Sequence, residues 1–147
     1  MMHHHPKKFF SPEEETRIIA AIKEAELQTS GEIRVHLAKS CGGSPHEAAV
    51  KVFEKIGMIR TAERNAVLFY LALKDRKFAL IGDKGIHERV GADFWEKVRD
   101  AVQHDFRKGE FAKGLVDGIR RSGGELARHF PRRADDKNEL PDEISKD

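Results

Sequence analysis

Residues 66–73 read AVLFYLAL, the longest apolar stretch of the 147-residue chain. The stretch is rich in aromatic and aliphatic residues, several of which favour strands. A strand with one solvent-facing side alternates apolar and polar residues, whereas a continuous apolar run is typical of a central strand covered on both faces. The stretch therefore predicts a buried central strand that needs helices above and below it.

Two further strands are predicted around this stretch. Residues 77–81 read KFALI and follow the short polar segment KDR at 74–76, so the two apolar runs should form an antiparallel hairpin that turns at Asp75. Upstream, residues 33–38 alternate Ile, Val and Leu with Arg, His and Ala, which indicates a strand with one buried face. Because a helix is expected between this strand and the central one, the two should be parallel, with a right-handed crossover.

Helix signals surround these strands. SPEE at 11–14 and SPHE at 44–47 each place a serine cap, a proline in the first turn and a glutamate three residues after the serine, the pattern of a capping box. Later helices are predicted from Gly91 to Phe106 and from about Phe111 to Phe130. The sequence thus predicts an α/β three-layer sandwich: a mixed sheet with a parallel β-α-β unit followed by an antiparallel hairpin, and helices on both faces.

One domain is expected over residues 11–130. Residues 1–10 are predicted to be a flexible N-terminus, and residues 131–147 a loosely ordered polar tail. Within the tail, Leu140 and Ile144 are the candidate anchors.

Composition limits the classes of function. The chain has 27 Lys+Arg against 25 Asp+Glu, a formal charge of +2, and no basic patch, so nucleic-acid binding is not expected. No apolar run approaches the ~20 residues of a membrane helix, and a single cysteine, Cys41, indicates a reducing compartment; we expect a cytoplasmic protein without membrane insertion. His3–His5 are interpreted as a mobile native end or the remnant of a purification tag.

Three segments carry a resemblance to a known family. They are TSGEIRV at 29–35, RNAVL at 64–68 and DRKFALIGDKGI at 75–86. In this order they resemble the TPM domain, which is named for a thylakoid lumen phosphatase-like protein, a photosystem repair protein and a modulator of acetylcholine receptors. The likeness runs from about Ser11 to Phe130. The pair FW at 94–95, the turn between Phe106 and Phe111, and HFP at 129–131 resemble the short, unanchored bacterial branch.

The resemblance implies a sheet sandwiched between helices. It also associates the chain with acid phosphatase activity, calcium binding and the assembly of membrane complexes. Many family members carry Asp-Asn-Gly before the central strand, where this chain has Arg64-Asn65-Ala66. The family's Gly-Tyr-Gly after the hairpin corresponds here to GDKG at 82–85, which brings Asp83 close to that position.

One end of the predicted sheet gathers candidate site residues. The starts of the first and central strands should meet the end of the returning strand, which brings together Glu32, Arg64, Asn65, Asp83 and His87. Carboxylate, amide and carbonyl oxygens are the ligands that calcium prefers.

A metal site would therefore use Glu32, Asp83 and Asn65, with Arg64 and the loop glycines Gly82 and Gly85 as further ligand-binding positions. Alternatively, Glu32 and Asp83 pair with Arg64 and Lys84 as an ion network, or Asp83 caps the turn that follows it.

The opposite end of the sheet holds the loop SCGGS at 40–44 beside Asp75 and Arg76. A glycine loop that leads into a helix start can receive an anion, but a plain capped turn has the same pattern. The loop lacks both common nucleotide-binding patterns. Cys41 is not followed by the Cys-x5-Arg cradle of a cysteine phosphatase. His36, on the first strand, is the histidine best placed to reach a partner, although a residue in such a position more often faces solvent.

These observations predict a binding or regulatory protein. It would have weak affinity for calcium or another divalent cation and act on an unidentified partner protein. The alternative is metal-assisted hydrolysis of phosphomonoesters, with carboxylates holding the ion and Arg64 clamping the phosphate.

Overall fold

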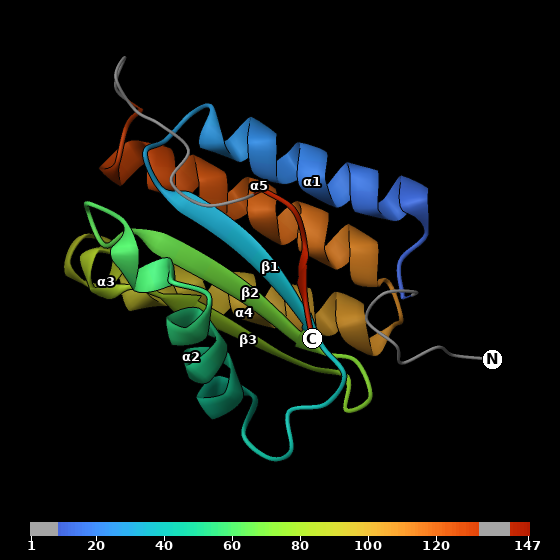
Figure 1. Ribbon diagram of the computed structural model, residues 1–147. Helices are drawn as coiled ribbons and strands as arrows, with labels where there is room; N and C mark the ends of the chain where they lie inside the picture. The colour runs from blue at the N-terminus through green and yellow to red at the C-terminus, as the bar shows by residue number, and fades with distance from the viewer. Residues whose placement is uncertain (1–8, 133–141) are drawn as a thin grey trace.

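The computed structural model describes residues 9–132 and 142–147. The interpretations of His3–His5 and of Leu140 lie outside these residues. Within them, a four-stranded sheet has the order β3-β2-β1-β4, with helices on both of its sides (Figure 1). The strands are β1 (Glu32–Ala38), β2 (Ala66–Ala72), β3 (Lys77–Gly82) and β4 (Ser145–Lys146).

The strand directions are those predicted from the sequence. β1 and β2 are parallel, with Glu32 opposite Ala66, and β2 and β3 form an antiparallel hairpin, with Val67 opposite Gly82. The predicted mixed sheet is therefore confirmed, and the starts of β1 and β2 lie at the same end of the sheet as the end of β3.

Helices cover the two faces unequally. One face carries α1, α4 and α5, while α2 and the short 3-10 helix η2 pack on the other (Figure 1). Among the described helices, none combines the length and apolar character that crossing a bilayer requires. The helices are α1 (Pro12–Glu26), α2 (Pro45–Lys55), η2 (Met58–Arg60), α3 (Lys84–Arg89), α4 (Ala92–Arg107) and α5 (Phe111–His129).

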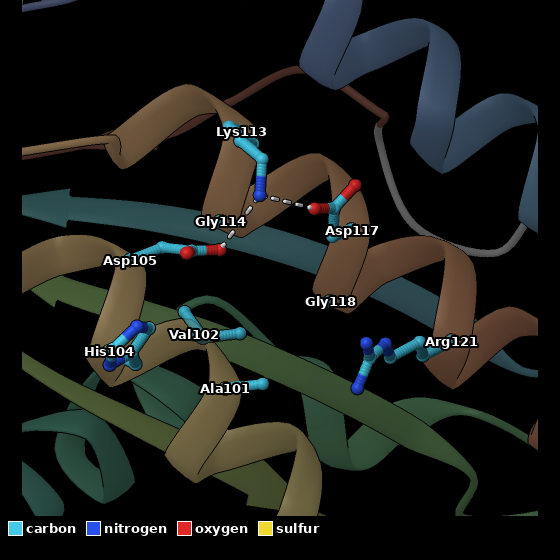
Figure 2. Close-up of a pocket in the computed structure, with 9 residues that line it drawn as sticks. All are labelled: Ala101, Val102, His104, Asp105, Lys113, Gly114, Asp117, Gly118 and Arg121. Atoms are coloured by element: carbon cyan, nitrogen blue, oxygen red, sulfur yellow. Dashed lines mark hydrogen bonds and ion pairs between the residues drawn. The ribbon is translucent and has the colours of Figure 1, made fainter.

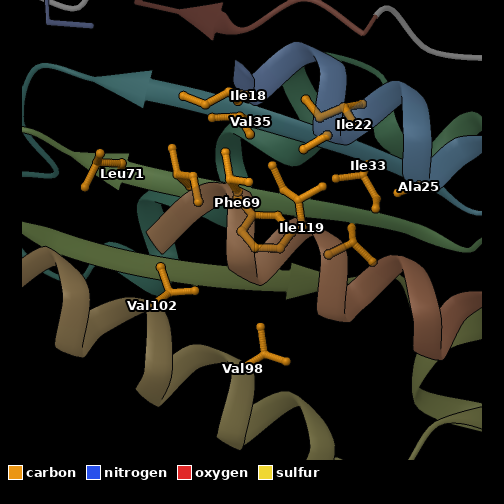
Figure 3. Packing of buried hydrophobic residues seen from close by; sticks show 14 of the residues in the cluster. Ile18, Ile22, Ala25, Ile33, Val35, Phe69, Leu71, Val98, Val102 and Ile119 are labelled. Atoms are coloured by element: carbon orange, nitrogen blue, oxygen red, sulfur yellow. The ribbon is translucent and has the colours of Figure 1, made fainter. Parts of the chain in front are cut away.

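Strand β2 is buried along its whole length. Its odd-numbered residues, such as Phe69 and Leu71, face the large core under α1, α4 and α5, where Figure 3 shows Phe69 close to Ile119 of α5. Its even-numbered residues, such as Leu68 and Tyr70, face the smaller core under α2. Both sides of β2 are covered, which explains why its sequence is continuously apolar.

The predicted capping signals mark real helix starts. The Ser11 hydroxyl accepts a hydrogen bond from the Glu14 N–H (3.1 Å), and the Glu14 carboxylate accepts one from the Ser11 N–H (2.9 Å). The Ser44 hydroxyl accepts from the Glu47 N–H (3.2 Å), and Gly57, with φ of 79°, follows the end of α2. These contacts satisfy donors that a helix start leaves without intrahelical partners.

The last residues differ from the prediction of a loosely ordered tail. Ser145–Lys146 form β4 and pair in parallel with β1, so that Ser145 lies opposite His36. Ile144, one of the candidate anchors, packs against the large core. Composition gave no sign of this strand because its contacts are tertiary and polar.

Candidate functional site

The sheet brings the predicted site residues to one end, as expected. Glu32 lies opposite Ala66 in the parallel pair, and the Asp83 N–H donates to the Ala66 carbonyl at 3.0 Å. Glu32 and Asp83 therefore flank the same residue of β2. Their side chains nevertheless belong to different sets of contacts.

Asp83 is engaged by Arg64. The guanidinium donates from Nε to Asp83 Oδ2 (2.6 Å) and from Nη2 to Asp83 Oδ1 (2.8 Å), and the Asp83 side chain is only 6% exposed. This pairing raises the pKa of Arg64. Asp83 Oδ1 also accepts from the Lys84 N–H at 2.8 Å, which caps α3. The Asp83 carboxylate thus forms the bidentate pair and the cap that the sequence offered as alternatives to a metal ligand.

We expect Asp83→Ala to destabilise the fold more than Asp83→Asn, by about 1 kcal/mol, which is the usual contribution of a helix cap. Asparagine removes the charge pair with Arg64 but keeps an oxygen for the Lys84 N–H, whereas alanine removes both. Urea denaturation of the two variants measures the difference. Equal midpoints would show that the cap contributes nothing.

Asn65 belongs to a second set of contacts. Its side-chain amide donates to Ser30 Oγ (3.1 Å) and to Glu63 Oε2 (3.4 Å), and Ser30 donates to the same Glu63 oxygen. Its backbone N–H donates to Thr61 Oγ1 at 3.3 Å. These bonds hold the segment before β2 against the segment before β1. Asn65 therefore has a structural role in this loop.

The two predicted loop glycines are close-packing positions. A Cβ at Gly85 would lie 2.3 Å from the Glu63 carbonyl oxygen and 2.7 Å from that of Arg64, and the Gly85 N–H donates to the Arg64 carbonyl at 2.9 Å. A Cβ at Gly82 would lie 3.1 Å from the Ile86 side chain. Gly85 is required because the two backbones approach more closely than a side chain allows.

Glu32 lies in a third environment, at the outer edge of β1. It is 2% exposed and neighbours Glu26, the last residue of α1, which is 6% exposed. Glu26 Oε2 accepts from the Ile33 N–H at 2.9 Å, so this carboxyl occupies the β1 edge where β4 does not reach. Burial above all, then hydrogen bonding to the Asp142 and Glu32 carboxyls, raises the pKa of Glu26 to about 11. Glu26 is therefore protonated at neutral pH.

The sequence reasoning missed Glu26 and Asp142. A signal for Glu26 was present, since it follows the buried Ile18 and Ile22 at spacings of four residues and so lies on the apolar face of α1. Asp142 gave no such signal in a polar tail. Among the residues that the structure describes, no group of three or more His, Cys, Asp or Glu side chains is arranged to hold a metal ion.

The opposite sheet end has a hollow of about 380 Å³ beside the loop that precedes α2, with Tyr70 among its lining residues. Asp75 Oδ2 accepts from the Cys41 N–H (3.0 Å), the Ser40 hydroxyl (2.9 Å) and the Cys41 thiol (3.3 Å), and these bonds lower the pKa of Asp75. A carboxylate of the chain therefore already accepts the Cys41 N–H. Asp147 also lines the hollow, and its negative charge disfavours a phosphate there. The arrangement supports a plain capped turn.

A second hollow, of about 250 Å³, lies between α4 and α5 (Figure 2). The Lys113 ammonium lies 3.2 Å from an Asp117 oxygen and 3.7 Å from an Asp105 oxygen, and these carboxylates raise the pKa of Lys113, Asp117 most strongly. Gly114 and Gly118 line it and let the helices approach each other closely. These ion pairs engage Lys113, Asp105 and Asp117, three of the polar side chains that line the hollow.

Comparisons with known proteins agree with the fold. None of the curated protein sequences compared with the chain matches it. The NMR structure of the BA42 protein from the psychrophilic bacterium Bizionia argentinensis is similar over 96% of this chain and 97% of its own, with a TM-score of 0.90 and 46% identity.

Two NMR structures of N-terminal domains share the fold at lower identity. The domain of the cg2496 protein from Corynebacterium glutamicum has a TM-score of 0.63 at 18% identity, covering 80% of this chain and 74% of its own. A domain from P. gingivalis has a TM-score of 0.64 at 20% identity, covering 86% and 84%. The family model described as the TPM domain matches residues 5–125. The chain therefore belongs to the TPM domain family.

Proposed function

We propose that the chain is a binding and regulatory protein in which a divalent cation, such as calcium, replaces a proton among the carboxyls of Glu26, Glu32 and Asp142. The observation that carries this proposal is the state of Glu26. Its carboxyl is buried against the Glu32 and Asp142 carboxyls, and these surroundings, burial above all, raise its pKa to about 11. A carboxyl oxygen buried in this way is costly unless a proton or a cation satisfies it.

These three carboxyls do not form a ready-made metal site in the described structure, so a cation would have to draw them together, but the type of their donor atoms suits a hard cation. Carboxylate oxygens are the ligands that calcium and magnesium prefer, and Glu26 is in hydrogen-bond contact with both Asp142 and Glu32. Glu32 is the one member of the metal set predicted from sequence that belongs here. The Asp83 carboxylate is engaged by Arg64, and the Asn65 amide bonds to Ser30 and Glu63.

The three carboxyls come from separate parts of the chain: the end of α1, the start of β1 and the segment that leads into β4. A cation held between them would fasten the C-terminal segment to the sheet. Cation binding would then regulate access of a partner protein to the β1 edge. The single free thiol, Cys41, supports a reducing, cytoplasmic location for this activity.

Metal-assisted phosphomonoester hydrolysis is the weaker proposal. Its phosphate clamp, Arg64, has Nε and Nη2 both engaged by Asp83. A phosphate would have to displace a largely buried carboxylate to reach the guanidinium.

Thermal denaturation near pH 7.5 tests the cation proposal, because a ligand that binds only the folded state raises Tm. We expect millimolar calcium to raise the Tm relative to a chelator control, and Glu26→Gln to abolish the shift. Asp83→Asn should lower the Tm but keep the calcium response, which makes it the matched control. No shift in the native chain, or a shift that survives in Glu26→Gln, would contradict the proposal.

An assay with an aryl phosphate, run in parallel with and without magnesium and calcium, tests hydrolysis. We expect no turnover. Turnover that Arg64→Gln abolishes would instead support the phosphatase alternative.

A further inference from the structure

The C-terminal segment is held against the sheet by a dense set of specific contacts. Figure 1 shows it running beside β1. The Asp147 N–H donates to the Leu37 carbonyl at 3.1 Å, and the Asp147 carboxylate accepts from the Lys39 N–H at 2.8 Å. The Lys146 ammonium donates to Glu15 of α1 at 2.5 Å. Two consecutive residues, Lys146 and Asp147, thus contact both the backbone at the end of β1 and the neighbouring helix α1.

His36 is the centre of these contacts. Its Nδ1 lies 2.9 Å from the Ser145 hydroxyl, its Nε2 lies 2.9 Å from Asp147 Oδ1, and its ring stacks on Tyr70 with centroids 5.8 Å apart. A neutral imidazole fits both partners, because Nε2–H donates to the carboxylate while Nδ1 accepts from the hydroxyl. Burial lowers the pKa of His36, which favours this neutral form. His36 is 4% exposed, so of the two alternatives for this residue the structure has the one in which it reaches partners and does not face solvent.

The contacts are those of strand addition, in which an extended peptide pairs with a sheet edge while alternate side chains give specificity. β1 pairs with the segment through its backbone, and the large core receives the apolar side chain of Ile144. His36 hydrogen-bonds to a hydroxyl and a carboxylate two positions apart in the segment. Lys39 supplies a backbone N–H for the same carboxylate. The groups that bind the segment, namely the β1 backbone, the large core, His36 and Lys39, all lie outside the segment itself.

We propose that the β1 edge is a peptide-binding site that the chain fills with its own residues 144–147, and that an extended segment of a partner protein displaces them. The partner segment carries an apolar residue, a hydroxyl residue, a basic residue that reaches Glu15 and an acidic residue in succession. This inference deepens the partner-binding part of the proposed function. It does not depend on the cation.

The probe is a synthetic peptide of residues 142–147, DEISKD, blocked at both ends. The acceptor is the full-length chain with Ile144→Asp and Asp147→Ala, two changes that remove the apolar and acidic contacts of its own segment. Binding is followed by NMR in the presence of a chelator, through the backbone amides of Leu37 and Lys39. A second acceptor, Ser145→Ala with Asp147→Ala, keeps Ile144 and guards against misfolding of the first.

We expect the peptide to bind both acceptors, with shifts centred on β1. The native chain should bind it at least about tenfold more weakly, because its own segment competes at an effective concentration in the millimolar range. A control peptide with asparagine at its last position should bind the acceptors about tenfold more weakly, since hydrogen bonds to a charged group contribute most.

Three results would overturn the inference: no binding at millimolar peptide to an acceptor with a native-like spectrum, equal binding to the native chain and the acceptors, or shifts remote from β1. Adding calcium afterwards separates the two proposals. Peptide binding without any calcium-dependent Tm shift in the native chain would refute the cation proposal alone. A calcium shift without peptide binding would refute this inference alone.

Discussion

Gly123→Ala is expected to destabilise the protein by about 1–3 kcal/mol, the usual cost of overpacking a close contact. A Cβ at Gly123 would lie 2.6 Å from the Cβ of Ala25 and 3.2 Å from its Cα, at the contact between α5 and α1. Neither helix can yield locally, because both pack on the same face of the sheet. The two helices would have to move apart, at the expense of the large core.

The neighbouring Gly124 is the matched control. A Cβ there would meet nothing within 4 Å, and the residue is exposed on the same helix. Gly124→Ala should therefore stabilise the fold by about 0.5–1 kcal/mol through the helix preference of alanine. Urea denaturation of both variants measures the contrast. Two stabilising changes would mean that α1 and α5 are packed more loosely than the structure shows.

Glu26→Gln is expected to stabilise the protein in the absence of divalent cations, increasingly so as the pH rises. The pKa of Glu26 is raised from 4.5 to about 11, so the folded state binds a proton that the unfolded state has already released at neutral pH. The stability that this carboxyl contributes is fully present below about pH 4.5 and is lost as the pH rises toward 11. Glutamine resembles the protonated acid, keeps an oxygen for the Ile33 N–H and has no proton to lose.

The measurement is the free energy of unfolding between about pH 5 and pH 9 in chelator. The charged or titratable side chains near Glu26 are two acidic ones, Glu32 and Asp142, and two basic ones, Lys23 and Arg132. Arg132 also donates to the Glu26 carbonyl at 2.7 Å. Glu24→Gln, on the exposed face of the same helix, controls for the loss of one charge. A pH profile of Glu26→Gln parallel to that of the native chain would show that Glu26 does not hold the proton.

The backbone arrangement could be predicted because it depends on patterns that a sequence states directly. The continuous apolar run of β2 requires cover on both faces, and a helix between two strands makes them parallel. From these two facts it followed that Glu32 and Asp83 lie at one end of the sheet. Side-chain partners do not follow from strand order. Arg64 and Glu26 are both close to that end, and only the structure shows that Asp83 pairs with the first and Glu32 neighbours the second.

The C-terminal strand could not be predicted from the sequence for a different reason. It consists of Ser145 and Lys146, neither of which favours a strand, and its position depends on His36 and Glu15. Contacts so far apart in sequence leave no periodicity. The raised pKa of Glu26 depends equally on distant groups, although the position of Glu26 on the apolar face of α1 was visible.

The pairing of β1 with β4 joins positions 109 residues apart. During translation, β1 leaves the ribosome long before Ser145 is polymerised, and in that interval its outer edge has no strand to pair with. Nascent chains with an open strand edge are prone to misassociation. The buried carboxyl of Glu26, which is synthesised before β1 and accepts the Ile33 N–H, protects part of that edge from the moment α1 and β1 come together.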